Sequence, residues 1–160
     1  MKERRQNERF SDGGELIYEF GDEFFVVCPK CAGKAKILRF EKGSEKLSER
    51  LTAPRKLICL NCPHRAEKRG GAVSIGASCD WYFGLPLWLQ VECGVETLWA
   101  YNEKHLEFIE KYVAAKLRER APHVNKSLAS RLPQWIVSAK NREEVLRAVG
   151  KLKGKLNGKS

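Results

Sequence analysis

The sequence CPKC at residues 28–31 and the sequence CLNC at residues 59–62 decide how the first half of this chain folds. Each has the C-x-x-C spacing, which turns the backbone so that both sulfurs point toward one ion. A hairpin between the two motifs returns the second pair of sulfurs opposite the first. Paired motifs of this kind are typical of a tetrahedral zinc site. We therefore predict one structural zinc ion held by four thiolates: Cys28, Cys31, Cys59 and Cys62.

Three other uses of these cysteines fit the sequence less well. Two disulfides would require an oxidising compartment, whereas residues 1–30 contain no apolar run long enough for a secretory signal peptide. A redox C-x-x-C motif usually occurs singly and within a βαβ pattern, which this region lacks. A catalytic zinc keeps one position open for water, and four cysteine ligands leave none.

The remaining cysteines, Cys79 and Cys93, have no C-x-x-C partner. Together with His64 or His105 they would make a second metal site, but lone cysteines among aromatic residues usually pack as small apolar side chains. Cys79, His105 and Asp80 can be written as a catalytic trio, yet no local motif links them. We expect packing roles for these residues and predict that the protein is not an enzyme.

The composition is that of a soluble globular protein. The chain has 160 residues, of which 42% are hydrophobic, enough for one compact domain or for a small metal module joined to a second core. No segment has the apolar length needed to span a bilayer. We therefore expect a cytoplasmic protein with no membrane partner.

The net charge of +10 is concentrated in two segments. Residues 28–76 carry 12 basic and 4 acidic side chains, and residues 111–160 carry 13 and 3, whereas residues 1–27 and 77–110 are acidic. Such a basic excess raises the affinity for a polyanion, most commonly nucleic acid. It serves equally as solubilising surface, so the charge alone leaves both interpretations open.

The apolar pattern of the first half predicts hairpins around the two cysteine pairs. Gly33 is expected to supply the positive φ that a metal-binding turn often requires. In chain order we expect a loose segment at residues 1–14, a hairpin at 15–27 with its turn at Gly21-Asp22, a strand at 35–40, an exposed insert at 41–54, a return strand at 55–58 and a short strand at 72–75.

The second half predicts one aromatic hairpin and then helices. Two β-prone runs flank Gly94, and their rings are expected to form a buried core, because residues 77–110 contain only Lys104 to interleave with them. The expected helices cover residues 103–120, residues 127–139 with a break at Pro133, and a last segment that opens at Asn141.

The first cysteine motif continues as C-P-x-C-x-G and is followed by a basic hairpin and a second C-x-x-C motif. This pattern resembles the zinc ribbons of transcription factor B-type proteins, RNA polymerase subunits and the primosomal helicase. Four further stretches are similar to a bacterial family known only by that ribbon, the transcription factor B-type zinc ribbon-containing proteins: DWYFGLPLWLQ at 80–90, LWAYNEKHLEFIEKYV at 98–113, NKSLASRLPQW at 125–135 and AKNREEV at 139–145.

The resemblance implies an architecture rather than an activity. It implies the four paired cysteines as metal ligands and a bacterial source. The chain departs from the better-known ribbon proteins because it is too short for cyclin-like repeats, and because GKLNGKS at residues 154–160 is one residue short of a phosphate-binding loop.

The predicted fold class is α+β, with an N-terminal zinc ribbon of antiparallel β-hairpins followed by a C-terminal helical segment. The predicted parts are a flexible N-terminus at residues 1–14, the zinc ribbon at 15–76, a β-hairpin with helices at 77–153 and a flexible tail at 154–160.

The leading functional hypothesis is a zinc-ribbon module that contacts nucleic acid backbone through its basic hairpin. The candidate contacts share a position in or beside the ribbon strands: Lys34, Lys36, Arg39, Arg55, Lys56, Arg65, Lys68 and Arg69. The alternative is a zinc-stabilised protein-interaction or scaffold module that does not bind nucleic acid directly, because the fold alone does not fix the function.

Overall fold

The computed structural model describes residues 9–40, 46–70, 73–119 and 127–158, and within them it confirms the predicted α+β class. The chain divides into two compact units. The ribbon unit comprises residues 20–90 and 99–102, and the helical unit comprises residues 1–19, 91–98 and 103–160. Each unit is described separately below.

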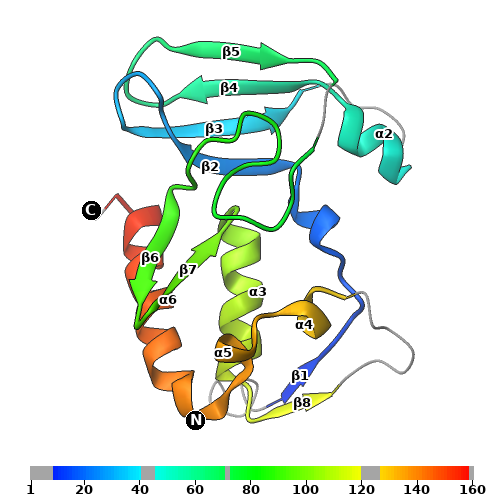
Figure 1. Ribbon diagram of the computed structural model, residues 1–160, viewed down its shortest axis with the longest axis vertical. Helices are drawn as coiled ribbons and strands as arrows, with labels where there is room; N and C mark the ends of the chain where they lie inside the picture. Colours follow the sequence, from blue (N-terminus) through cyan, green and yellow to red (C-terminus); the bar gives the residue numbers. More distant parts are fainter. Residues whose placement is uncertain (1–8, 41–45, 71–72, 120–126, 159–160) are drawn as a thin grey trace. The chain divides into compact units, whose positions relative to one another are not determined.

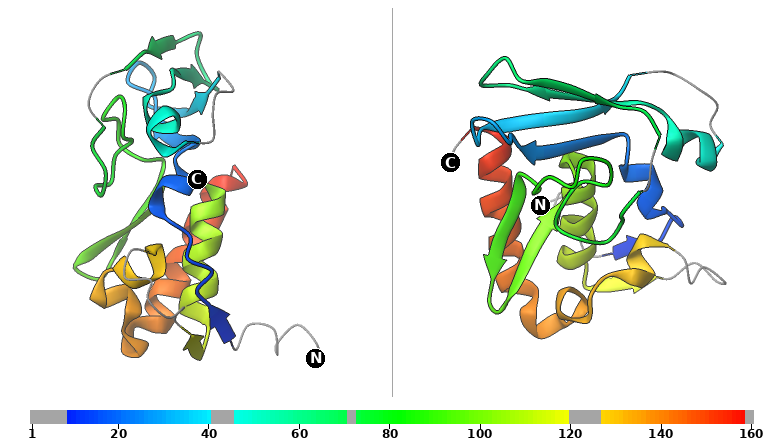
Figure 2. Two further views of the ribbon diagram at one scale, coloured as in Figure 1. Left: turned by 90° about the vertical axis from the view of Figure 1, so that its right-hand side faces the viewer. Right: turned by 45° about the horizontal axis from the view of Figure 1, so that its top comes forward.

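The ribbon unit is built on a four-stranded antiparallel sheet whose strands follow one another in the order of the chain (Figures 1 and 2). Each strand pairs with the next through a short turn or an insert, so the contacts within the sheet are local in sequence. The strands are β2 (Glu23–Val27), β3 (Lys34–Arg39), β4 (Arg55–Cys59) and β5 (Arg65–Lys68).

One face of this sheet is buried, and the strand register fixes which residues lie on it. Directly paired residues on antiparallel strands share a face. Ile37 pairs with both Phe24 and Leu57, and all three side chains are at most 1% exposed. The residues that alternate with them are mostly half-buried and include the strand lysines. This two-residue period explains why the strands form where they do.

Aromatic rings fill the core of the ribbon unit. The ring centroids of Phe24, Trp81 and Tyr101 lie 5.1, 5.3 and 5.2 Å apart, in edge-to-face arrangements. A Cβ at Gly21 would lie 2.2 Å from the Trp81 ring, so only glycine fits there. Trp81 is 2% exposed, which confirms that these rings belong to a core. Such pairs add about 0.5–1.5 kcal/mol each beyond their buried area.

Buried Asp80 shapes the loop that carries these rings. Its carboxylate accepts hydrogen bonds from the backbone amides of Tyr82 (2.8 Å), Phe83 (2.7 Å) and Leu85 (2.7 Å). A charge that is 1% exposed is tolerated because three donors satisfy it.

The helical unit packs two helices, α3 (Glu103–Ala114) and α6 (Arg142–Leu156), against each other. Their buried side chains recur at the helical period, which is why these segments form helices. The buried aliphatic residues are Leu106, Ile109 and Val113 of α3 and Val145, Val149 and Leu152 of α6. Short elements complete the unit: η1 (Ile17–Phe20, of which Phe20 belongs to the ribbon unit), α4 (Leu128–Arg131), α5 (Gln134–Val137) and η2 (Ala139–Asn141).

The predicted hairpin around Gly94 is confirmed. It consists of β6 (Leu89–Cys93) and β7 (Glu96–Ala100), and Gly94 has a φ of 64° in the turn. An L-residue with a side chain adopts this conformation rarely, whereas glycine adopts it at no steric cost.

A strand at residues 9–11 is a feature that the sequence did not predict. β1 (Arg9–Ser11) pairs in parallel with β8 (Leu117–Glu119), a segment that we expected to continue the α3 helix. Buried Asp12 holds the segment further, because it accepts hydrogen bonds from the Ser127 hydroxyl (2.5 Å) and the Gly14 amide (2.9 Å). Residues 9–14, expected to be loose, are therefore tied to two distant parts of the chain.

Several other boundaries differ from the prediction. The expected hairpin at 15–27 is instead η1 followed by β2, which pairs with β3, and the insert contains α2 (Leu47–Thr52), although residues 41–45 lie outside the described part. The expected strand at 72–75 is absent over residues 73–75, and residues 71–72 are not described. The break expected at Pro133 within residues 127–139 is confirmed, since α4 ends at Arg131 and α5 begins at Gln134, whereas α6 extends through Leu156 into the expected tail.

No helix among the described residues has the length and apolar character needed to cross a membrane.

Acid should destabilise the helical unit through His105 of α3. Its imidazole is 3% exposed, and burial lowers its pKa from 6.5 to about 3. A depressed folded-state pKa means that the unfolded chain binds the proton first below pH 6.5. Stability should therefore fall by about 1.4 kcal/mol per pH unit once the pH is well below 6.5.

The measurement is urea unfolding of the wild-type protein and of His105→Leu between pH 7.5 and pH 5, a window above most carboxylate titrations. The variant should lose stability more slowly over this window than the wild type. Parallel pH profiles would show that His105 is not the group responsible.

Candidate metal centre and basic face

The four paired cysteines come together at one end of the ribbon sheet. The first motif lies in the turn from β2 to β3, and the second lies at the end of β4 and in the turn to β5. Because β3 pairs with both neighbours in antiparallel register, Ala35 lies opposite both Val26 and Cys59, and the two turns emerge at the same end. All four sulfurs lie within 4.8 Å of one another.

The distances fit a shared metal ion and exclude disulfides. The Sγ atoms of Cys28 and Cys62 are 3.8 Å apart, and those of Cys31 and Cys59 are 3.5 Å apart. A tetrahedral ion with metal–sulfur bonds of about 2.3 Å places its sulfurs about 3.8 Å apart. A disulfide would need about 2.05 Å. The cluster could therefore hold one metal ion, as the sequence predicted.

Backbone amides turn toward the sulfurs, as a thiolate site requires. The Cys28 sulfur accepts from the Lys30 amide (3.4 Å), and the Cys31 sulfur accepts from the Gly33 amide (3.4 Å). In the second turn, the Cys59 sulfur accepts from the amides of residues 61 and 62, both at 3.3 Å. These donors stabilise negative charge on sulfur before any ion binds.

Two of the thiols, those of Cys59 and Cys62, have pKa values shifted in opposite directions. Burial raises the pKa of Cys59, but the amide hydrogen bonds from Asn61 and Cys62 outweigh it and lower that pKa to about 6. At Cys62 the amide of His64 lowers the pKa, yet burial and the neighbouring thiols raise it to about 12. Crowded sulfurs cannot all ionise without a cation among them, so the cluster favours a divalent ion that takes up the charge.

Gly33 has a different role from the one predicted. Its φ is not positive; the positive φ of the first turn, 61°, belongs to Ala32. A Cβ on Gly33 would instead lie 2.2 Å from Nδ2 and 2.8 Å from Cγ of Asn61 in the second turn. Glycine is needed here because the two metal-binding turns approach each other closely.

The structure removes Arg55 from the candidate nucleic-acid contacts. Its side chain is 1% exposed, and its guanidinium donates to the Tyr82 hydroxyl (2.7 Å) and to the carbonyl oxygens of Arg50 (3.0 Å) and Gly21 (3.3 Å). Burial lowers the pKa of Arg55 below its ordinary value, although Tyr82 opposes this shift. A guanidinium buried in the core, with its Nη2 group committed to these acceptors, cannot also hold a phosphate.

Arg39 and Lys68 share the buried side of the sheet with Arg55. Arg55 is paired with Arg39 on β3 and with Lys68 on β5, so the three side chains leave the same face. Arg39 forms an ion pair with Asp22 at 3.5 Å, and Lys68 donates to the Tyr82 carbonyl. Both side chains are therefore held by contacts within the protein and are not free to contact nucleic acid.

The opposite side of the sheet collects most of the remaining candidates. The strand register places Lys36 beside Ile58, Ile58 beside Arg65, and Lys56 beside Leu38. Lys34 precedes Lys36 by two positions and shares its face. We call the following set the basic face: Lys34, Lys36, Lys56 and Arg65, with Phe40 and Arg69 at its edge.

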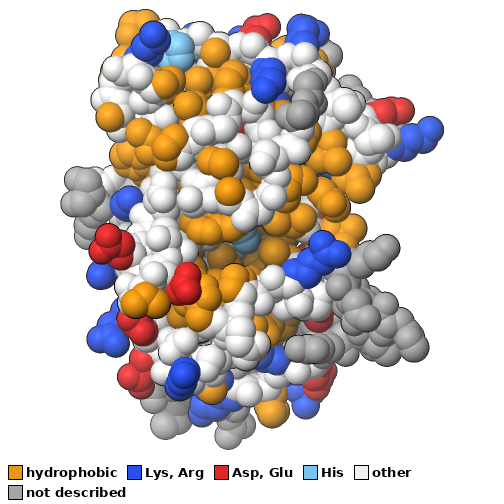
Figure 3. Space-filling model, viewed as in Figure 1, with side chains coloured by type: hydrophobic (Ala, Val, Ile, Leu, Met, Phe, Trp, Pro, Cys, Tyr) orange, Lys and Arg blue, Asp and Glu red, His pale blue; other side chains and the backbone are white. Residues whose placement is uncertain are grey.

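Two phenylalanine rings lie among these cations. The ammonium groups of Lys34 and Lys36 lie 4.3 and 5.4 Å from the ring centroid of Phe25. Phe40 is 38% exposed and lies 6.0 Å from the Lys56 ammonium and 5.7 Å from the Arg69 guanidinium. Figure 3 shows basic and apolar side chains intermixed over the ribbon strands at the top of the view.

Phe40 is the residue that sequence reasoning missed. The sequence placed it as the last residue of the strand expected at 35–40. The side chains of Ala35 and Ile37 in that strand are fully buried, whereas Phe40 is partly exposed beside Lys56, which lies on the Leu38 side of the sheet. Strict alternation from Leu38 would have placed Phe40 on the basic face.

Two carboxylates moderate the charge of this face. Lys36 pairs with Glu23 at 3.6 Å, and Lys56 pairs with Glu67 at 4.0 Å. Each of these side chains is at least 36% exposed. Exposed pairs of this kind are worth at most about 1 kcal/mol, so a stronger anion can displace the carboxylate.

No second metal cluster occurs among the described residues. Cys93 is 7% exposed at the end of β6, and burial raises the pKa of its thiol, which fits the expected packing role. Cys79 is half-buried and forms an isolated β-bridge with Pro86.

Comparison of the chain with protein-family models, curated proteins and solved structures found no match.

Adding one methyl group at Gly33 should weaken metal binding. Gly33→Ala would push the Asn61 side chain and separate the two turns, with a cost of about 1–3 kcal/mol, which corresponds to a loss of about 5- to 150-fold in metal affinity. Asn61→Ala in the same chain removes the two closest atoms and should restore most of the affinity. The measurement is competition for zinc with a chromophoric chelator.

Asn61→Ala alone serves as the control and should bind metal nearly as the wild type does. If Gly33→Ala binds as tightly as the wild type, the two turns do not need their close approach.

Proposed function

We propose that the four cysteines hold one structural zinc ion, and that the ribbon so fixed binds single-stranded nucleic acid on its basic face. The observation that carries the proposal is Phe40, a partly exposed ring with the cationic groups of Lys56 and Arg69 at 6.0 and 5.7 Å from its centroid. Proteins that bind single strands combine cations for the backbone with aromatic rings on which bases stack.

Zinc is the ion that the donor set supports best. Soft thiolate ligands select zinc, copper(I) or iron over calcium and magnesium, and four cysteines at tetrahedral spacing suit zinc. Four cysteines complete a tetrahedral coordination sphere, which supports a structural role for the ion. The resemblance of the cysteine motifs to zinc ribbons supports the same assignment.

A single strand suits the basic face better than a duplex. The bases of a duplex are stacked on each other and paired, so a surface ring such as Phe40 cannot reach their faces. The bases of a single strand can turn outward and stack, while the phosphates contact the strand lysines. Every base presents a π-face, so we expect little sequence preference.

Metal content tests the first half of the proposal. Purified protein should contain about one zinc per chain, and Cys28→Ser should lose most of it and unfold the ribbon unit, because metal binding and folding are coupled. Cys93→Ser, which changes a buried cysteine outside the cluster, is the matched control and should retain the zinc. Mass spectrometry under non-denaturing conditions measures the stoichiometry.

A full zinc complement in Cys28→Ser would contradict the assignment of the ligands. So would an unchanged thermal unfolding curve after exhaustive chelation of the wild type.

Nucleic-acid titrations test the second half. Fluorescence anisotropy with labelled single-stranded DNA and RNA should show binding that weakens with salt. Phe40→Ala should lower the affinity about tenfold by removing a stacking surface worth about 1–3 kcal/mol. Lys56→Gln should lower the slope of log K against log salt by about 0.7 for one lost phosphate contact.

Ile75→Ala and Lys104→Gln are the controls, since Ile75 is as exposed as Phe40 and Lys104 lies outside the basic face. Both should bind as the wild type does. No binding at low salt would refute the proposal. Recovery of one stoichiometric protein partner after nuclease treatment would then favour the protein-interaction alternative.

A further inference from the structure

The exposed side of α6 carries a basic stripe that belongs to no site described so far. Arg147 and Lys151 are exposed and lie four residues apart, so they project from one side of the helix about 6 Å apart along its axis. Lys155 continues the same row by one turn. Among residues 145–158 there is no Asp or Glu.

Neither Arg147 nor Lys151 is committed to a structural contact. Within the described part of the chain, neither forms a hydrogen bond or an ion pair. Lys153, on the other side of the helix, differs because it pairs with Glu110 of α3 at 2.5 Å. The stripe and the packed side of α6 are therefore distinct.

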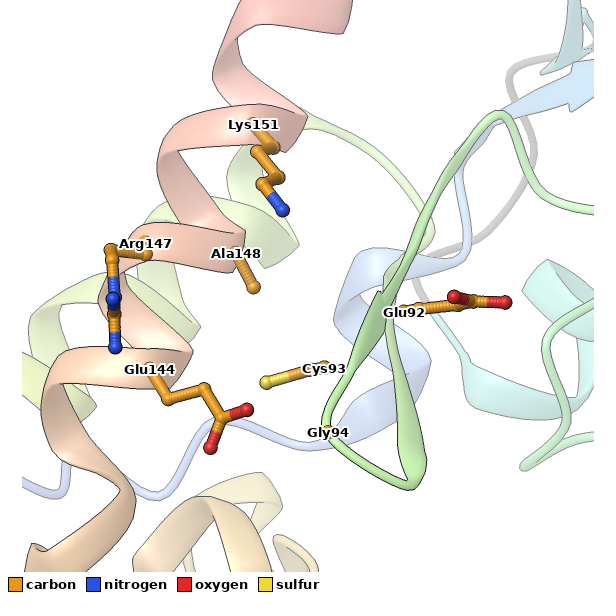
Figure 4. A pocket seen from close by; sticks show the side chains of 7 residues that line it. All are labelled: Glu92, Cys93, Gly94, Glu144, Arg147, Ala148 and Lys151. Carbon is orange, nitrogen blue, oxygen red and sulfur yellow. The ribbon is translucent and has the colours of Figure 1, made fainter.

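The stripe borders a shallow cavity of about 270 Å³ between α6 and the turn of the β6–β7 hairpin. Figure 4 shows Arg147, Ala148 and Lys151 along the helix, with Cys93 and Gly94 across from them. Glu144 lies at the N-terminal end of this wall and points toward the turn. Its carboxylate would repel an anion, so it marks the end of the stripe.

Gly150 adds an observation that packing does not explain. It is exposed in the interior of α6, and a Cβ there would meet no atom within 4 Å. Glycine is the least favourable residue in a helix interior apart from proline. Its absent side chain leaves the backbone beside Lys151 open to close approach by a partner.

We infer that this stripe is a second phosphate-binding surface, which holds the backbone of the same nucleic acid that the ribbon binds. The identity of the polymer rests on the proposed function. The charge of the stripe favours a polyanion. A membrane surface fits less well, because the apolar side of α6 is buried against α3 and is not free to insert into lipid.

The test uses the full-length, zinc-loaded protein and a labelled oligothymidylate in anisotropy titrations over a range of salt concentrations. The double variant Arg147→Gln/Lys151→Gln should bind more weakly, and its slope of log K against log salt should fall by about 1.4 for two lost contacts. Lys111→Gln/Lys140→Gln, which removes two exposed charges elsewhere in the helical unit, should retain the wild-type slope.

Two single variants separate binding from stability. Gly150→Ala should raise the melting temperature, because alanine favours the helix, and yet weaken binding by blocking close approach. Glu144→Gln should tighten binding by removing a repulsive charge. An Arg147→Gln/Lys151→Gln variant with unchanged affinity and slope would overturn the inference.

The outcomes distinguish this inference from the proposed function. If Phe40→Ala and Lys56→Gln weaken binding but the α6 variants do not, the ribbon site stands and the second surface is refuted. If only the α6 variants weaken binding, the stripe stands and the basic face is refuted. Binding to vesicles of anionic lipid without binding to the oligothymidylate would overturn both.

Discussion

The convergence of four sulfurs within 4.8 Å is the constraint on which the ribbon unit depends. It constrains one end of each of the four strands, because the β2–β3 turn and the β4–β5 turn must leave the sheet at the same end. It also explains two local features, the glycine at residue 33 and the amide donors around each sulfur. Without a cation, the closely spaced sulfurs would repel one another on ionising and would oppose this arrangement. With a cation, the same four sulfurs would serve as its ligands.

Once the register is fixed, the two-residue period of the strands separates two uses of basic side chains. On the buried side, the guanidinium carbon of Arg55 lies 4.4 Å from the centroid of the Tyr82 ring. The same guanidinium donates a hydrogen bond to the Tyr82 hydroxyl inside the core. On the other side, Lys34 and Lys36 cover the Phe25 ring but keep their ammonium groups near solvent. A count of basic residues cannot distinguish these uses, because the use depends on which face of the sheet a residue points to, and this alternates from one position of a strand to the next.

The cysteine cluster was predictable from the sequence because its signal is local: the spacing within each C-x-x-C motif directs two sulfurs to one side of a turn, and the hairpin between the motifs brings the two pairs together. The Gly94 hairpin and the α3 and α6 periods were predictable for the same reason. The pairing of Phe10 with Arg118 in β1 and β8 was not, since it joins segments more than a hundred residues apart, and neither segment has the length or alternation of a strand. Likewise, the burial of Arg55 depends on Tyr82, which the sequence places 27 positions away.

The metal site also changes how the charge of the ribbon should be interpreted. Four thiolates and one divalent cation sum to a charge of −2, and this charge would lie at the end of the sheet where Lys30 and Arg65 are exposed. Arg65 already donates to the carbonyl of Cys59 at 3.2 Å, in the second metal-binding turn. With such an ion bound, part of the basic excess in residues 28–76 would offset the charge of the site and would not be available to a polyanion. Under the proposed function, phosphate would therefore contact the part of the basic face around Lys36 and Lys56, with the exposed ring of Phe40 at its edge, because there the cations are balanced only by displaceable surface carboxylates.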